Sequence, residues 1–177
     1  WFKLWCAAGP GANYGLEEIG VENLAFAATP NDFVKALAKR APRGRFPRGF
    51  SGEQPYWTIV GIDGGSEQGL LGEDGAIEVA KGGFSIEPFL LSDGKLVTWA
   101  HVQATQSIAD GYLPIPSVHW AHADGALDIT AFAQGSPESS QLVARYRLRN
   151  TSATSRDYTL ALALRPLQVN PPSQFLN

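Results

Sequence analysis

The chain has 177 residues, of which 44% are apolar and 18% charged, so it can bury one sizeable core and does not have the composition of a disordered protein. Its formal net charge of −3 argues against a dedicated nucleic-acid-binding protein, whose affinity would rest on a basic surface. No apolar run approaches the ~18 residues of a membrane span, and a single cysteine leaves no internal disulfide.

One segment near the N-terminus has the signals of a helix. Residues 31–40 predict a helix, because Asn31 is a favourable N-cap, basic residues close the segment and Pro42 ends it. Phe33 and Leu37 are spaced i, i+4, so we expect them to be the apolar pair of this helix.

The chain divides into three parts. Residues 1–20 predict an N-terminal arm, residues 21–168 a β-sandwich domain that includes the helix, and residues 169–177 the start of an interdomain linker. A strand is expected over residues 21–26. The stretch GPGANYG in the arm is one residue too long for a dinucleotide-binding loop and follows no strand, so we expect no cofactor.

From about residue 56 onward, apolar and polar residues alternate between Asp-Gly pairs. Asp-Gly between alternating runs is a strong hairpin signal, because a type I′ turn needs positive φ at both central residues. We expect such turns at Asp74-Gly75, Asp93-Gly94 and Asp124-Gly125. Many short strands and one short N-terminal helix predict a mainly β fold, an antiparallel β-sandwich.

The register of two hairpins can be predicted from these turns. Strands at 118–123 and 126–134 would place Trp120 opposite Ile129 on a largely apolar face, with His119 and Asp128 on the other face. The hairpin at Asp74-Gly75 would place Leu71 opposite Glu78.

Two further runs alternate strictly. Arginine occupies every second position of one run (Arg145, Arg147 and Arg149), and leucine occupies every second position of the other (Leu160, Leu162 and Leu164). The Leu-Ala repeat has high helix propensity, but its period of two favours a strand. We expect residues 142–149 and 158–165 to pair as one long hairpin with matching apolar faces.

The arginine row has three interpretations. It could bind an anionic ligand, although a straight row diverges with strand twist. It could be an entirely solvated face. We favour a docking face for the N-terminal helical segment or for a further domain, because arginine stacks and makes bidentate contacts where lysine stays hydrated.

No motif identifies a catalytic site, and no catalytic residue is assigned. His119 with Asp128 could act as a general base, but a cross-strand polar contact is the commoner outcome. Glu87 lies in an apolar strand, so it is either buried with a partner or placed at an edge beside Pro88. No cysteine pair or His-Glu-x-x-His motif is present, so no metal site is expected.

Exposed aromatic rings are the residues to examine for sugar binding, because a ring offers a flat apolar surface. Trp99 and Trp120 are expected to pack in the core. Tyr56 and Tyr112 fall in loops and are the candidate carbohydrate-binding residues.

Four stretches of the chain resemble the β-sandwich region of large bacterial proteins of the coagulation factor 5/8 type (discoidin-like). They are PRGRFPRGFSGEQPYWTIVGIDGG, EDGAIEVAKGGFSIEPFL, DGYLPIPSVHW and RPLQVNPPSQFLN. In that family the sandwich precedes a glycosidase-like catalytic region built as a six-hairpin toroid. The resemblance covers residues 21–177 and carries over no catalytic residue.

The resemblance implies a non-catalytic accessory domain of a carbohydrate-active, glycoside hydrolase-like parent. Its expected partner is the downstream catalytic domain of the same polypeptide. An independent carbohydrate-binding module is the alternative, and a small enzyme in its own right is the third reading. The single cysteine leaves the compartment open, with a preference for a periplasmic or secreted location.

Overall fold

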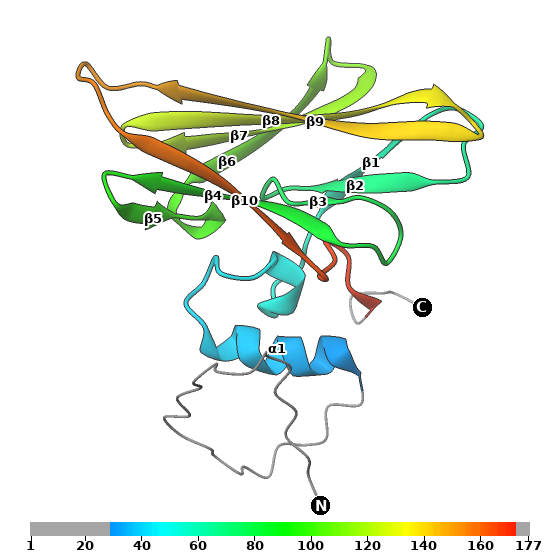
Figure 1. The fold of residues 1–177 in the computed structure, drawn as a ribbon, viewed down its shortest axis with the longest axis horizontal. Coiled ribbons are helices and arrows are strands. Elements are labelled where there is room, and N and C mark those ends of the chain that lie inside the picture. The colour runs from blue at the N-terminus through cyan, green and yellow to red at the C-terminus, as the bar shows by residue number, and fades with distance from the viewer. Residues whose placement is uncertain (1–28, 173–177) are drawn as a thin grey trace, which may run out of the picture.

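The structure, a computed structural model, describes residues 29–172 and contains two antiparallel sheets that face each other (Figure 1). One sheet has six strands: β1 (Trp57–Gly61), β2 (Gln68–Gly72), β3 (Ile77–Glu78), β4 (Ser85–Ser92), β5 (Lys95–Val97) and β10 (Tyr158–Arg165). The other has four: β6 (Gln103–Ala109), β7 (Leu113–His122), β8 (Gly125–Ser136) and β9 (Ser139–Asn150). The predicted antiparallel β-sandwich is confirmed. The arm expected at 1–20 and the strand expected at 21–26 lie outside the described residues.

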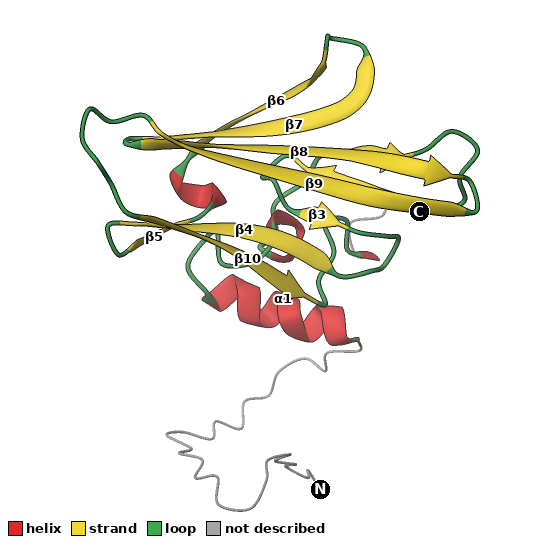
Figure 2. Cartoon of the chain, turned by 45° about the horizontal axis from the view of Figure 1, so that its top comes forward, coloured by secondary structure: helices red, strands yellow, loops and turns green. Residues whose placement is uncertain are grey.

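Helix α1 (Pro30–Arg40) lies beneath the six-stranded sheet as a third layer (Figure 2). It begins earlier than predicted, because Thr29 and not Asn31 is the N-cap. The Thr29 hydroxyl accepts a hydrogen bond from the Asp32 backbone N–H at 3.2 Å, and the Asp32 carboxylate accepts one from the Thr29 N–H at 3.1 Å. This reciprocal capping box satisfies two backbone donors, which a cap at Asn31 would leave open.

The buried side of α1 also differs from the prediction. Phe33 and Leu37 are 52% and 45% exposed, so they do not form the packing stripe. The side chains of Val34 and Ala38, one position further along, pack instead in an apolar cluster that contains Phe50 and Leu167. Phe50 ends the 3₁₀ helix η1 (Arg48–Phe50), and this packing decides which side of α1 is covered.

The three Asp-Gly turns have different outcomes. Asp93-Gly94 forms the predicted two-residue loop, with φ of 49° and 76°, between the paired residues Ser92 and Lys95. The turn at Asp74-Gly75 is one residue longer, because the Gly72 N–H donates to the Ala76 carbonyl across three residues. Leu71 therefore pairs with Ile77 and not with the predicted Glu78. This shift of one residue sends Glu78 to the outer face of the sheet.

The β7–β8 hairpin turns one position earlier than predicted. His122 pairs with Gly125, so Trp120 lies opposite Leu127 and not opposite Ile129. The register differs by two residues, which leaves every side chain on its predicted face. Gly125 is a strand residue without positive φ, and its missing side chain serves a different purpose, since a Cβ there would lie 3.2 Å from the Tyr158 hydroxyl oxygen.

The long hairpin predicted between residues 142–149 and 158–165 is wrong. Strand β9 pairs with β8, whereas β10 pairs with β4 in the opposite sheet. The connection at 151–157 crosses from one sheet to the other (Figures 1 and 2). Leu148 and Leu160 both pack against the core, as their alternation predicted. Two strands with one apolar face each can pair in one sheet, or they can lie in opposite sheets and pack their apolar faces against each other. Strands β9 and β10 lie in opposite sheets.

The core lies between the two sheets and is formed by nine buried residues: Val60, Leu71, Ile77, Trp99, Val118, Trp120, Leu127, Ile129 and Ala131. Trp120 is 1% exposed, and its indole N–H donates to the Asp74 carbonyl at 3.0 Å. The indole N–H of Trp99, in the 3₁₀ helix η2 (Trp99–His101), donates to the Phe46 carbonyl at 3.0 Å. Both tryptophans are core residues, as predicted.

Candidate functional site

An apolar groove lies on the outer face of the six-stranded sheet. It has a volume of about 270 Å³, and Trp57, Ile59 and Leu70 from β1 and β2 line it. Their neighbours Val60 and Leu71 are buried in the core on the other face, so these two strands are apolar on both faces. Trp57 is 36% and Ile59 55% exposed. A contiguous exposed apolar surface of this kind is a candidate contact site.

The second wall of the groove is the segment 168–172, which we call the C-terminal strap. The strap is anchored by the Glu78 carboxylate, which is 2% exposed and accepts hydrogen bonds from the backbone N–H groups of Gly82, Val169 and Asn170 at 2.9, 2.9 and 3.1 Å. Val169 and Pro171 are buried. Over its described part, the segment predicted as a linker therefore packs against the sandwich.

The polar side chains at the rim of the groove differ in whether they already make hydrogen bonds within the described part of the chain. Gln168 accepts a hydrogen bond from the Asn31 side chain at 3.0 Å, which ties the strap to the start of α1. The side-chain oxygen of Asn170 is buried and has no hydrogen-bond partner within residues 29–172. Gln68 and Lys81 complete the polar part of the lining.

A second cavity, of about 360 Å³, opens at one end of the sandwich and is polar. Arg156, from the 151–157 connection, pairs there with Asp93 in the β4–β5 turn and, at 3.5 Å, with Asp124 in the β7–β8 turn. The hydrogen bond to Asp93 and the charge of Asp124 raise the pKa of Arg156. This arginine thus joins the turns of the two sheets.

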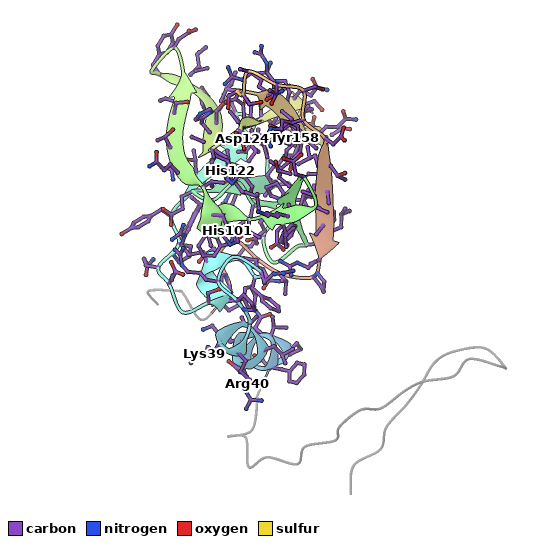
Figure 3. The ribbon with its side chains drawn as sticks, turned by 90° about the vertical axis from the view of Figure 1, so that its left-hand side faces the viewer. Lys39, Arg40, His101, His122, Asp124 and Tyr158 are labelled. Carbon is purple, nitrogen blue, oxygen red and sulfur yellow. The ribbon has the colours of Figure 1, made fainter. Side chains whose placement is uncertain are left out.

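Two histidines line the same polar cavity. Figure 3 shows His101, His122 and Asp124 one above another along this end of the sandwich. Nδ1 of His101 accepts a hydrogen bond from the Thr98 N–H at 3.1 Å. Nδ1 of His122 and Nε of Arg156 are buried and have no hydrogen-bond partner in the described part of the chain. The cavity could hold a small polar ligand, but its main charges already neutralise one another.

The buried carboxylates do not form an acid–base pair. Glu87 is 4% exposed and accepts hydrogen bonds from Arg165 Nε at 2.9 Å and from the Ser85 hydroxyl at 2.7 Å. Strand β4 lies between β3 and β10 here, so the edge position considered for Glu87 is wrong and the buried, partnered position is correct. Burial raises the pKa of Asp74 to about 6, but Asp74 lines neither the groove nor the polar cavity.

The two candidate sugar-binding tyrosines are exposed but separate. Tyr56 precedes β1 and is 65% exposed, whereas Tyr112 lies in the β6–β7 turn of the other sheet and is 75% exposed. Neither lines the groove or the polar cavity. Their role in carbohydrate binding stays a prediction.

The arginine row lies on the outer face of the edge strand β9, and all three side chains are exposed. The Asp128 carboxylate contacts Arg149 at 3.1 Å and His119 Nδ1 at 2.6 Å, so the histidine makes the expected cross-strand polar contact. Helix α1 lies under the opposite sheet (Figure 1), so the row does not meet this helix. Docking of the row onto a further domain stays a prediction.

Within residues 29–172, no three His, Cys, Asp or Glu side chains converge as metal ligands would. No helix in this range combines the length and the apolarity that crossing a membrane requires.

Sequence reasoning missed the groove. The signal that could have found it is apolar residues at consecutive positions of β1 and β2, in WTIV and GLLG, where a half-buried strand would alternate with polar residues. The strap could not be placed, because it reaches the groove from about 90 residues further along the chain, as the Glu78–Val169 hydrogen bond shows. Comparison with known proteins found no matching family model, no matching curated protein and no matching solved structure.

Proposed function

We propose that this chain is a non-catalytic β-sandwich accessory domain that docks, through the groove around Trp57, onto the downstream domain of the same polypeptide. The observation that carries the proposal is the apolar groove itself, bounded by the C-terminal strap. A domain that follows the strap would emerge at the rim of the groove. Docking there would require closure of only a short loop, which keeps its entropic cost small.

The parent in this proposal is a carbohydrate-active bacterial protein with a glycosidase-like catalytic region, as the resemblance of the four stretches implies. The state of the buried carboxylates supports a non-catalytic role for the sandwich. Glu87 is neutralised by Arg165, and Glu78 accepts backbone hydrogen bonds, so neither is free to act as a general acid or base. We therefore expect purified chain not to hydrolyse aryl glycosides, and turnover that is lost on Glu87→Gln would contradict the non-catalytic assignment.

The docking proposal is tested by hydrogen exchange on two proteins, this chain alone and the chain extended by its following domain. We expect slower exchange of the β1 amides in the extended protein than in the chain alone. Trp57→Asp in the extended protein should abolish this protection, because it places a charge in the apolar contact. Tyr112→Asp, the same kind of change at an exposed aromatic on the other sheet, should not. Equal exchange of β1 in the two proteins would rule out docking through the groove.

One observation favours a second candidate, an independent carbohydrate-binding module. The ring of Trp57 and the amide side chains of Gln68, Gln168 and Asn170 line the same groove. An aromatic plane with amides at its rim is suited to a sugar ring and its hydroxyl groups. Binding to a glycan array by the isolated chain, lost in Trp57→Ala but kept in Tyr56→Ala and Tyr112→Ala, would support this candidate. Absence of binding by the folded chain would count against it.

A further inference from the structure

The six-stranded sheet ends in an edge strand that exposes leucines. Among the described residues β10 pairs only with β4, so its free side carries unpaired backbone N–H and C=O groups. Leu160 packs against the core, but Leu162 is 40% and Leu164 67% exposed. These three side chains alternate along β10 and therefore share the face that points toward the opposite sheet. The apolar row thus continues beyond the area that the opposite sheet covers.

Two of the other edges carry features that oppose strand addition. The edge strand β9 presents the arginine row, and the edge strand β5 has three residues and begins with Lys95. Strand β10 has eight residues, no proline and no charge before Arg165, which is already paired with Glu87. A long apolar edge without charges readily accepts another strand.

We propose that β10 pairs antiparallel with β10 of a second copy of this chain, around a two-fold axis that passes between the two Leu162 residues. In this register Leu162 faces its own counterpart, and Leu160 faces the partner's Leu164. On the other face of the sheet Ala161 lies opposite the partner's Ala163. Arg165 lies opposite the partner's Thr159, so no two like charges meet.

The sequence of β10 is self-complementary in this arrangement. Leucines meet leucines on one face and alanines meet alanines on the other, because the Leu-Ala repeat reads the same in both directions around Leu162. Pairing covers the exposed parts of Leu162 and Leu164 and satisfies the free backbone groups of both edges. The interface is isologous, so it closes with two chains and does not propagate into a filament. It is independent of the groove around Trp57.

Sedimentation velocity over a concentration series tests the proposal with the chain as it exists. We expect a reversible equilibrium between monomer and a species of twice the 19.0 kDa chain mass. Leu162→Lys should shift the protein to monomer at every concentration, because it places two ammonium groups against each other across the axis. Leu37→Lys is the matched control, since Leu37 on α1 is 45% exposed against 40% for Leu162, and it should dimerise as the wild type does.

A charge-swap experiment keeps the test informative if Leu162→Lys alone alters the fold. Leu162→Glu should also be monomeric, and an equimolar mixture of the Lys and Glu variants should recover the dimer, because position 162 faces position 162 only in the proposed register. Wild-type chain that remains monomeric throughout the series would overturn the proposal. So would a dimer that survives Leu162→Lys, a dimer that is lost in Leu37→Lys, or a mixture that fails to recover.

Discussion

The carboxyl group of Asp74 should make the stability of this protein depend on pH. It lies in the β2–β3 turn, is 4% exposed, and accepts a long hydrogen bond, 3.4 Å from the Ala76 N–H. Burial raises the pKa of Asp74 from 3.8 to about 6, although the charge of Arg48 acts in the opposite direction. The folded protein therefore holds this proton to higher pH than the unfolded chain does.

The size of the effect follows from linkage between protonation and folding. A difference of about 2 pKa units corresponds to about 3 kcal/mol in the free energy of unfolding. The stabilisation that the neutral acid contributes is complete below about pH 4 and is lost as the pH rises to about 6. Asp74→Asn keeps the shape and the acceptor oxygen but never ionises, so it should raise the free energy of unfolding at neutral pH by as much as about 3 kcal/mol.

Urea unfolding of the wild type and of Asp74→Asn, measured from about pH 4 to about pH 8, checks this prediction. The advantage of the variant should grow as the pH rises to about 6 and should then stay constant. Asp63→Asn makes the same change at an exposed loop position and should stay close to the wild type at each pH. A pH-independent difference between the Asp74 variant and the wild type, or a variant that is less stable at neutral pH, would refute the reasoning.

Two further predictions concern stability. Gly75→Ala should be more destabilising than Gly94→Ala by about 1–3 kcal/mol in urea unfolding. Both glycines have positive φ, but a Cβ on Gly75 would also overlap Ile129, whereas Gly94 has open space around it. Equal losses of stability in the two variants would contradict this prediction. Arg165→Met should lower the free energy of unfolding by about 3–5 kcal/mol, because it leaves the Glu87 carboxylate buried without its cation. Adding Glu87→Leu to this variant should recover part of the loss in thermal or urea unfolding. A double variant no more stable than Arg165→Met would argue against the buried carboxylate as the cause.

The amino-acid sequence alone determined the features that depend on neighbouring residues. Three such features were predictable: the Asp93-Gly94 hairpin, the helix that ends before Pro42, and the strand character of the Leu-Ala repeat. Each rests on a local cause, namely the φ angles that a turn requires, the capping of exposed backbone groups and the period of apolar side chains. The two-residue shift in the β7–β8 hairpin left its faces unchanged for the same reason, since alternation has a period of two.

The tertiary structure alone decided which surfaces meet. Nothing local distinguishes a strand that pairs with β9 from one that crosses to the opposite sheet, so the separation of β9 and β10 could not be read from their alternating residues. Glu87 is buried against Arg165, which lies 78 positions further along the chain. Glu78 is buried against the C-terminal strap, where its partner Val169 lies 91 positions further along. The groove around Trp57 depends on distant residues in the same way. The exposure of the groove depends on how far the strap and the helix layer extend over the sheet, which is decided by long-range packing. The pattern of each strand specifies only that a face is apolar and does not specify what covers that face.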